Sequence, residues 1–422
     1  MSGLNFLNKL LDGVDVEWLS LGELGDFIRG NGLQKKDFVE SGFPAIHYGQ
    51  IYTRYGLSAD KTFTYVLPEL ANKLRKAQKN DLLLATTSEN DEDVVKPLAW
   101  LGDNVAISGD MMLFRHEQNV KYLAYFFQSE IFQTQKMKYI TGAKVRRVSS
   151  GDLSKIKIPI PCSNNPEKSL AIQSEIVRIL DKFTALTAEL TAELNMRKKQ
   201  YNYYRDQLLS FDDEQEKPIY LEKLLDGVEV EWLPLGEVSA LRRGRVMSKG
   251  YLTENFGPYP VYSSQTANNG KIGSINTFDF DGEYISWTTD GANAGTVFYR
   301  TGKFSITNVC GLITLKNKYP LIYKFLFYWL TIEAKKHVYS GMGNPKLMSH
   351  QVENIPVPVP CPDNPEKSLA IQSEIVRILD KFDTLTNSIT EGLPREIELR
   401  QKQYEYYRDL LFSFPKPETV SN

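Results

Sequence analysis

Cysteine and histidine are scarce in this sequence, and their scarcity limits the chemistry that the chain can carry. There are three cysteines and four histidines in 422 residues. No CxxC pair occurs, so we expect neither a disulfide framework nor a cysteine-based metal site. The histidines follow no metal-ligand spacing. Cys162 and Cys361 end two similar stretches, IPIPC and VPVPC, and we interpret both as small buried apolar residues.

An excess of one charge is also missing. The 50 basic and 52 acidic residues leave a net charge of -2. This balance argues against a protein that coats nucleic acid over its whole surface. It leaves room for local basic patches, because the distribution of charge decides binding.

Long hydrophobic runs are absent. No segment approaches the ~18 consecutive apolar residues of a membrane-spanning helix. The N-terminus lacks the basic and apolar regions of a signal peptide. We therefore expect a cytoplasmic protein that does not associate with a membrane.

Signatures of catalysis are missing as well. Gly302-Lys303 lacks the earlier glycine and the following Ser or Thr of a P-loop. No GxGxxG occurs, and Asn165-Pro166 continues into Glu167 instead of forming the (N/D)PP(Y/F) run of amino-methyltransferases. We predict a non-catalytic binding or scaffolding part without a metal site.

What the sequence does contain is a long internal repeat. Asn165–Phe183 reads NPEKSLAIQSEIVRILDKF and occurs again, letter for letter, at Asn364–Phe382. LLDGVDVEWLSL at Leu10–Leu21 is nearly repeated at Leu224–Leu235. We interpret the tryptophans of these two stretches, Trp18 and Trp232, as core anchors. A repeat of this kind fixes the architecture before any local interpretation.

Two variable blocks, about 25–155 and 239–355, lie between the repeated stretches. In the first, we expect strands at Phe43–Ile51, Asp81–Thr86 and Val105–Phe114 and a helix at Val120–Phe132. In the second, we expect strands at Pro258–Tyr262, Glu283–Thr288, Gly295–Tyr299 and Val309–Leu315 and a helix at Leu321–Ala334. The same order of elements with unrelated letters predicts two domains of one fold.

The repeated stretch has the pattern of a long helix. Asn164 or Asn165 can cap it, and Pro166 suits its first position. Its apolar residues follow the a/d spacing of a coiled coil in both copies: Ile172, Ile176, Ile179, Phe183, Leu186, Leu190 and Ile371, Ile375, Ile378, Phe382, Leu385, Ile389. We predict two helices of about 45 residues that pair antiparallel within one chain. A homodimer with four parallel helices is the alternative.

The two helices differ after the identical stretch. The first carries a tandem tetrapeptide, TAELTAEL, at Thr187–Leu194. The second has four extra residues around Glu391–Glu396, where Gly392 and Pro394 should break or kink the helix.

These patterns predict an α+β fold. Two mixed α/β domains of one fold are separated by an antiparallel two-helix coiled coil, with pseudo-two-fold internal duplication. The expected boundaries are 1–160 for the first domain, 161–213 for the first helix, 214–360 for the second domain, and 361–422 for the second helix and tail.

Basic and polar residues in loops are the candidate DNA contacts, since Lys and Arg neutralise phosphates and polar side chains read base edges. In the first block they are Tyr48, Gln50, Tyr52, Arg54, Lys144, Arg146 and Arg147. In the second block they are Arg242, Arg243, Arg245, Tyr262, Ser263, Ser264, Gln265, Asn268, Thr289, Asp290, Asn293 and Lys346. A solvated charged face, or simple loop structure, is the alternative interpretation. Two different readers on one spacer would imply a bipartite target.

The duplication, the IPIP…NNPEKSLAIQSEIVRILDKF block and the TAEL tandem resemble the DNA-specificity (S) subunit of type I restriction-modification enzymes, in particular the type IC group. The resemblance implies two target-recognition domains that each read half of a split double-stranded DNA site in the major groove. It implies helices that act as a ruler and bind two modification subunits. S-adenosylmethionine, ATP and magnesium are then expected on the modification and restriction (translocase) subunits, with no cofactor on this chain.

Two other functions stay open at this stage. One is a coiled-coil scaffold that binds proteins, and the other is a free-standing DNA-binding regulator. Tyrosines gather at the helix ends: Tyr201, Tyr203, Tyr204, Tyr404, Tyr406 and Tyr407. They favour obligate partners if exposed, or packing of the helix ends on the domains if buried.

Overall fold

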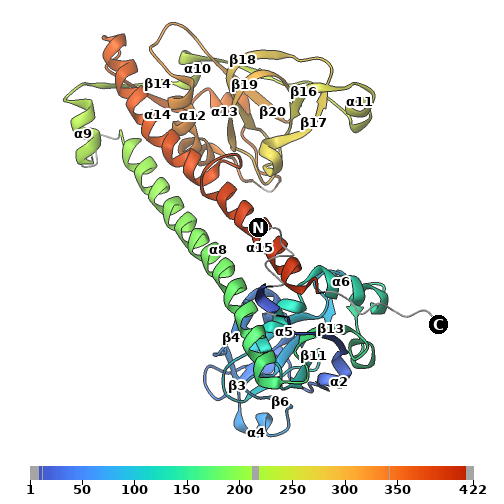
Figure 1. The fold of residues 1–422 in the computed structure, drawn as a ribbon. Helices are drawn as coiled ribbons and strands as arrows, with labels where there is room; N and C mark the ends of the chain where they lie inside the picture. Colours follow the sequence, from blue (N-terminus) through green and yellow to red (C-terminus); the bar gives the residue numbers. More distant parts are fainter. Residues whose placement is uncertain (1–8, 12, 212–217, 342, 415–422) are drawn as a thin grey trace. The chain divides into compact units, whose positions relative to one another are not determined.

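The computed structural model describes residues 9–11, 13–211, 218–341 and 343–414. The chain forms two compact units. Unit 1 consists of Met1–Leu190 and Ile397–Asn422, and unit 2 of Thr191–Glu396. Each combines one mixed α/β domain with parts of the long helices (Figure 1). The predicted domain boundaries after residues 160, 213 and 360 stay a prediction, because the compact units divide the chain inside its helices.

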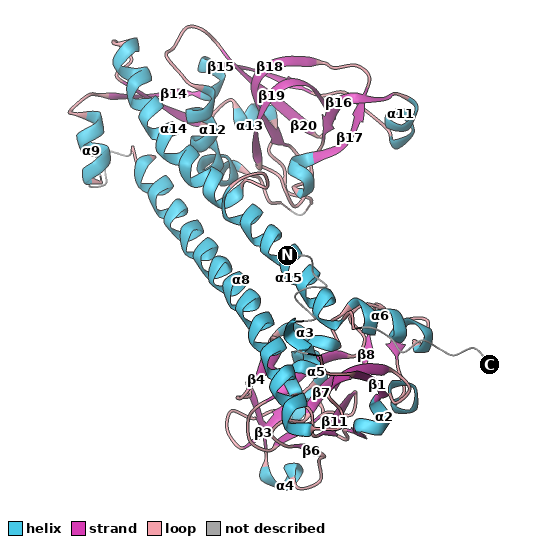
Figure 2. Cartoon of the chain, viewed as in Figure 1, coloured by secondary structure: helices cyan, strands magenta, loops and turns pink. Residues whose placement is uncertain are grey.

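Unit 1 contains two main sheets (Figure 2). The five-stranded sheet has the order β2-β11-β7-β9-β4, formed by Gly25–Arg29, Met111–His116, Leu82–Ala85, Lys96–Trp100 and Ser58–Ala59. The four-stranded sheet has the order β5-β3-β10-β6, formed by Thr64–Val66, Phe43–Ile46, Val105–Ile107 and Lys76–Ala77. Strand β7 is buried on both faces, since α5 (Val120–Phe126) packs on one and α3 (Tyr48–Thr53) on the other. Its continuous apolar run, LLLA, fits that position.

Unit 2 has one six-stranded sheet of order β15-β20-β18-β19-β16-β17. Its strands are Ser239–Arg243, Cys310–Leu315, Phe280–Thr288, Val297–Ile306, Phe256–Tyr262 and Lys271–Ile275. Helix α12 (Tyr323–Glu333) packs on β18 and β19 and buries Phe325, Leu326 and Trp329. This helix is therefore apolar on most of its surface.

The two domains share one strand framework. The order β2-β11-β7-β9-β4 in unit 1 matches β15-β20-β18-β19-β16 in unit 2. In both, the last two strands pair parallel (β4 with β9, β16 with β19) and the others antiparallel. The prediction of two domains of one fold is confirmed.

A short antiparallel strand pair closes each domain where the chain enters and leaves it, and we call it the clasp. In unit 1 the clasp is β1 (Val16–Ser20) with β13 (Lys157–Pro161), and in unit 2 it is β14 (Val230–Pro234) with β21 (Pro356–Pro360). The registers correspond, with each tryptophan opposite a proline.

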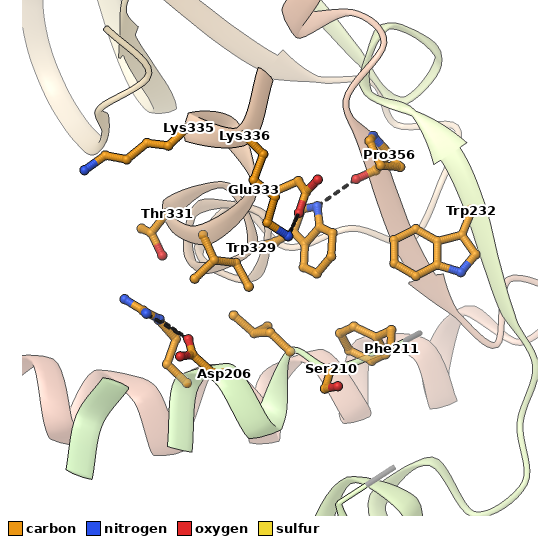
Figure 3. Close-up of a pocket in the computed structure, with 13 residues that line it drawn as sticks. Asp206, Ser210, Phe211, Trp232, Trp329, Thr331, Glu333, Lys335, Lys336 and Pro356 are labelled. Atoms are coloured by element: carbon orange, nitrogen blue, oxygen red, sulfur yellow. Dashed lines mark hydrogen bonds and ion pairs between the residues drawn. The ribbon is translucent and has the colours of Figure 1, made fainter. Parts of the chain in front are cut away.

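The clasp tryptophans differ in burial. Trp18 is buried in the core, as predicted. Trp232 is 38% exposed, so its assignment as a core anchor was wrong. Its ring lies 5.5 Å from that of Trp329 at the edge of a pocket of about 870 Å³ (Figure 3).

The first long helix, α8, runs without interruption over Pro166–Leu208. The Asn165 Oδ1 accepts a hydrogen bond from the backbone N–H of Lys168, which confirms the predicted cap. The second copy is divided into α14 (Pro365–Asn387) and α15 (Gly392–Phe412).

The predicted break in the second helix is thus confirmed. Gly392 has a φ of +73°, and a Cβ there would lie 2.4 Å from the carbonyl oxygen of Thr384. Ile389 falls in this break and is 79% exposed, so its assignment to the a/d positions was wrong.

Within each unit the helices pair antiparallel, as predicted. In unit 1, Phe183 of α8 stacks on Tyr407 of α15 with ring centres 5.1 Å apart. In unit 2, Tyr204 of α8 stacks on Phe382 of α14 at 5.4 Å. Each copy of the repeated stretch also buries an apolar stripe against its own domain: Ile172, Ile176 and Leu180 in unit 1, and Ile371, Ile375 and Leu379 in unit 2.

The first block differs from the expected elements at three places. The single strand expected at Val105–Phe114 is two strands, β10 and β11, which belong to different sheets. The strand expected at Phe43–Ile51 ends at Ile46, because His47 accepts a hydrogen bond from the Gly49 N–H and starts helix α3. The helix expected at Val120–Phe132 divides into α5 and α6 (Glu130–Lys136), since Ser129 caps a second helix. Both caps stop an element that apolar periodicity alone would extend.

The interpretation of Cys162 and Cys361 was also wrong. Both are half-buried and have left-handed φ values of +51° and +48°. They form the turn between clasp and long helix, where the chain must change direction.

The remaining elements are short. In unit 1 they are α2 (Leu21–Leu24), η1 (Lys35–Asp37), α4 (Pro68–Ala71), β8 (Thr87–Ser88), η2 (Met137–Tyr139), β12 (Arg146–Arg147) and α7 (Ser150–Leu153). In unit 2 they are α9 (Ile219–Leu225), α10 (Leu235–Val238), α11 (Lys249–Glu254), η3 (Ala267–Gly270), η4 (Ala334–His337) and α13 (Ser349–Val352). No helix in the described ranges is long and apolar enough to cross a membrane.

Candidate nucleic-acid interface

In unit 1, the segment that follows strand β7 meets the loop that closes the domain. Arg146 and Arg147 form β12, which pairs antiparallel with β8. The Arg146 Nε lies 2.8 Å from Asp91 Oδ1, whereas Arg147 is exposed. Lys144 is exposed at the tip of a hairpin that backbone hydrogen bonds between Thr141 and Arg147 close. Three predicted cations therefore lie on one surface feature, which the 141–147 hairpin and the β8 segment form together.

Tyr52 joins the same feature from helix α3. Its hydroxyl lies within hydrogen-bond distance of the carbonyl oxygens of Ala85, Thr87 and Asp93, at 3.1, 2.9 and 3.3 Å. Burial raises the pKa of Tyr52, so the hydroxyl keeps its proton. The side chain thus supports the β8 segment, and a base contact by Tyr52 stays a prediction.

The other candidates of unit 1 lie on the same helix or directly after it, with different surroundings. The Gln50 Oε1 accepts from the His47 N–H, and its Nε2 donates to Thr64 Oγ1. Tyr48 is half-buried, with its ring 4.6 Å from that of His47. Arg54 is exposed, and its guanidinium lies 5.7 Å from the ring centre of Phe63, which is 53% exposed.

In unit 2, four predicted residues come together beyond the end of β18. Asp290 forms an antiparallel bridge with Lys346, and their charged atoms are 4.0 Å apart. Thr289 is buried and donates its hydroxyl proton to Asp290 Oδ2 at 2.6 Å. The Asn293 Nδ2 donates to the carbonyl oxygen of Ser264 at 3.4 Å, which joins this cluster to the next loop.

These two clusters occupy corresponding places. β7 and β18 are the matching strands, and in each unit the segment after that strand pairs with the domain-closing loop. Thr141 with Arg147 and Tyr339 with Lys346 form the same kind of bridge at the base of that loop. Arg147 and Lys346 are thus equivalent exposed cations on one framework, surrounded by unrelated side chains.

The loop after β16 carries the other polar candidates of unit 2. Tyr262 and Ser263 are half-buried, and the Ser263 hydroxyl lies 2.8 Å from that of Thr307. The Gln265 Nε2 donates to the carbonyl oxygen of Lys271. Asn268 is exposed and left-handed, with a φ of +50°.

The three arginines at the start of the second domain separate. Arg242 is exposed on β15. Arg243 donates to the carbonyl oxygen of Asn308 at 2.7 Å and reaches toward Met348, near the Lys346 loop. Arg245 lies apart and pairs with Asp279 at 3.0 Å, and the hydrogen bonds that it donates to Tyr251 and Asp279 raise its pKa.

One residue of this region, Arg300 on β19, was missed by the sequence reasoning. It is 3% exposed and contacts Tyr262 and the backbone of Asn269. The available signal was a single cation within an otherwise largely apolar stretch, TVFYRTG. Among the residues that the structure describes, no cluster of three or more His, Cys, Asp or Glu side chains could hold a metal ion.

The framework defines a duplicated two-domain protein with basic, polar loops at matching positions of two sheets. A family model described as "Type I restriction modification DNA specificity domain" matches residues 13–197 and 227–399, one copy for each half. The chain belongs to this family, whose function is DNA sequence recognition.

Two curated relatives come from Escherichia coli. The specificity subunit of the type I restriction enzyme EcoR124I/EcoR124II is 40% identical over the full length of both chains. The specificity subunit of the type I restriction enzyme EcoprrI is 34% identical over 93% of each chain.

Two solved structures share the fold at low identity. One is the S subunit of a type I restriction-modification system from M. genitalium, with a TM-score of 0.54, 17% identity, and coverage of 96% of this chain and 98% of that one. The other comes from a study of complex assembly and conformational transition of the type I R-M system, with a TM-score of 0.56, 15% identity, and coverage of 94% and 97%.

Proposed function

We propose that this chain is the specificity subunit of a type I restriction-modification complex and reads a split DNA target. The domain of unit 1 reads one half and the domain of unit 2 the other, each in the major groove. The observation that carries the proposal is the shared strand framework with different side chains at the same two places. Duplication explains the common frame, and a different half-site for each domain explains the different loops.

The chemistry of the two clusters suits duplex DNA. Exposed Lys144 and Arg147 in unit 1, and Arg242 and Lys346 in unit 2, are available to neutralise phosphates. Polar side chains beside them, such as Asn268, have the donors and acceptors that distinguish base pairs in the major groove. A protein scaffold would not need cations at equivalent places in both domains.

The long helix is proposed to set the distance between the half-sites. The boundary between the compact units falls between Leu190 and Thr191, in the middle of the TAELTAEL tandem of α8. One tetrapeptide contributes roughly 6 Å of rise and a net rotation of about 40°. One base pair contributes about 3.4 Å and roughly 34°. The rotation of one tandem unit therefore matches that of about one base pair, while its rise of roughly 6 Å is closer to that of two.

The chain is proposed to supply recognition and no catalytic step. The relatives named above are subunits of restriction enzymes, which supports a complex in which other chains act. Two modification subunits would bind S-adenosylmethionine, and restriction subunits would bind ATP and magnesium. The outward faces of the repeated helices offer two like surfaces, since Glu175 with Arg178 and Glu374 with Arg377 form the same ion pair.

Deletion of Thr191–Leu194 tests the spacer. The variant is expressed with its modification subunit, and methylated adenines are mapped by sequencing. We expect both half-sites to keep their bases while the gap between them shortens by about one base pair.

The matched control replaces Thr191–Leu194 by four alanines, which keeps the helix length and a high helix propensity. This variant should retain the original gap. An unchanged gap in the deletion would exclude the ruler, and a changed gap in the alanine variant would show that the side chains, rather than the length, set the spacing.

A further inference from the structure

Arg300 is a buried cation that faces no carboxylate within the described part of the chain. It is 3% exposed and lies in the middle of β19. Burial lowers the pKa of Arg300 to about 10, and Tyr262 and Cys310 partly offset this effect. The guanidinium therefore stays charged at neutral pH, and the surrounding groups must replace its lost hydration.

Two aromatic rings and two hydrogen bonds make this replacement. The guanidinium carbon lies 3.6 Å from the ring centre of Tyr262 and 4.5 Å from that of Phe298. The Nε donates to Ser286 Oγ at 3.0 Å, and an Nη1 hydrogen goes to the backbone carbonyl oxygen of Asn269 at 2.8 Å. The last bond joins the sheet to the loop that follows β16.

That loop needs such a contact because its backbone is unusual. Asn268, Asn269 and Gly270 are consecutive left-handed residues, with φ values of +50°, +55° and +82°. Asparagine tolerates the left-handed region better than other non-glycine residues, but a run of three left-handed residues still depends on the surroundings that hold it. The Ser263 N–H closes the loop on the Gly270 carbonyl, and a Cβ on Gly270 would lie 3.1 Å from Arg300 Nη2.

We propose that Arg300 is the positioning residue that holds the 263–270 loop in the conformation in which it reads DNA. Tyr262 precedes the loop and stacks on the guanidinium, while Asn269 accepts its hydrogen bond. Gln265 and Asn268 lie between these two contacts and are the side chains that Arg300 places. The inference rests on the proposed function of unit 2 as the reader of one half-site.

Only an arginine satisfies these contacts together. Its planar fork donates from Nε to Ser286 and from Nη1 to Asn269 while its face stays against Tyr262. A lysine could reach one acceptor at a time without the planar stack. Arg300→Lys should therefore retain the charge and lose the loop geometry in part.

The test compares Arg300→Met and Arg300→Lys in the assembled modification complex, with methylated sites mapped by sequencing. Discrimination at one or more bases of the unit 2 half-site should fall by about tenfold in Arg300→Met, the size of one lost base contact. Arg300→Lys should lie between wild type and Arg300→Met. The half-site of unit 1 should keep its bases, a separation that a general loss of stability would not produce.

Two further variants make the result decisive. Gly270→Ala introduces a Cβ at a positive φ beside Arg300. It should lower discrimination at the same bases without altering the strands. This variant therefore decides the question if Arg300→Met does not accumulate. Lys303→Met removes an exposed cation from the same strand and should leave the whole target unchanged. Full retention of the unit 2 half-site in Arg300→Lys and Gly270→Ala would overturn the proposal.

Exchange of residues 239–355 for the corresponding block of another specificity subunit tests the proposed function of unit 2 separately from the role of Arg300. If the exchange changes one half-site but the Arg300 and Gly270 variants do not, only the role of Arg300 fails. If the exchange changes neither half-site, the proposed function of unit 2 fails as well.

Discussion

At the scale of single residues, Lys136 of unit 1 has an unusual environment for a lysine. Its side chain is buried, and its Nζ donates to the carbonyl oxygens of Glu92 and Val94 at 2.9 and 3.0 Å. Val95 next to this segment is left-handed, with a φ of +69°, which is costly for a β-branched residue. Lys136 thus holds the acidic 89–93 segment beside Arg146 and Tyr52.

This environment predicts a pH dependence. Burial lowers the pKa of Lys136 from its ordinary 10.5 to about 8, with Asp93, Asp91 and Glu92 opposing the shift. Between about pH 8 and 10.5 the unfolded chain binds the proton that the folded chain has released, so the free energy of unfolding should rise with pH. The free energy of unfolding of the wild type should rise, relative to that of Lys136→Met, by at most about 1.4 kcal/mol per pH unit.

Chemical denaturation of both proteins from pH 7 to 9.5 measures this difference. Arg75→Met, which removes an exposed cation of the same unit, serves as the control and should follow the wild type. A wild-type stability that falls with pH relative to Lys136→Met would contradict the assignment.

The two equivalent cations predict a salt dependence. If Arg147 and Lys346 each neutralise one phosphate, Arg147→Ala and Lys346→Ala should each make the slope of log K against log salt less negative by about one. Binding of the assembled complex to duplex DNA at several salt concentrations measures the slope. An unchanged slope in both variants would remove these residues from the phosphate contacts.

The candidate contacts show what a sequence can and cannot predict at this scale. Arg147 and Lys346 were recognised because a cation in the loop that closes a domain can be read directly from the amino-acid sequence. The internal hydrogen bonds of Tyr52 and Gln50 were not, because they depend on a helix that begins at His47 and on distant carbonyl groups. Arg300 was missed for the same reason, since its meaning depends on a loop about thirty residues earlier in the chain.

At the scale of elements, the repeated helix stretch does more than face outward. The family resemblance implied that these helices bind two modification subunits. The structure adds a role inside each unit, because Asp380 of α14 pairs with Lys324 Nζ at 2.6 Å and accepts the Tyr328 hydroxyl proton at 2.6 Å. Asp181 of α8 makes the same contacts with Lys121 and Tyr125.

Removal of the Asp380 carboxylate should weaken the packing of α14 on the domain of unit 2. Asp380→Ala loses two hydrogen bonds to a charged acceptor and leaves the Tyr328 hydroxyl without it, so we expect unit 2 to lose about 2 kcal/mol of unfolding free energy. Asp383→Ala, one turn further along α14, is the control and should cost less than about 0.5 kcal/mol. Thermal unfolding followed by tryptophan fluorescence measures both, and equal stabilities would refute the role of Asp380.

The sequence predicted the helices better than the domains. Pro166, the asparagine cap and the break at Gly392 are local signals, and all three are confirmed. The end of the a/d pattern was wrong at Ile389, because α14 ends at Asn387 and Ile389 lies in the break. The tyrosines divide between the two interpretations that stayed open, with Tyr404 buried and Tyr203, Tyr204 and Tyr406 exposed.

At the scale of the whole molecule, the duplication was the most informative feature of the sequence. Identical stretches fixed the number of domains and their common fold before any strand was placed. The sequence did not show that five strands keep the same order in both halves, because strand pairing joins residues far apart in the chain. The four-stranded sheet of unit 1 was missed since its strands are only two to four residues long.

Exchange of a whole domain predicts a change in one half of the target. If residues 25–155 are replaced by those of a relative with a different target, the methylated motif should change in one half-site and keep both its other half and its gap. Methylated-adenine sequencing reads both halves at once, so the untouched half is an internal control. Loss of the whole motif in a complex that still assembles would contradict independent reading.

The clasps have a consequence for inheritance. Because β1 and β13 bring the two ends of a domain together, one genetic crossover on each side could transfer an entire reading surface between related genes. The helix carboxylates Asp181 and Asp380 would stay in the recipient because they lie outside the clasps, whereas the Lys and Tyr side chains that bind them would move with the domain. A lineage that carries such genes could acquire a new DNA target in one recombination event, without the evolution of a new protein.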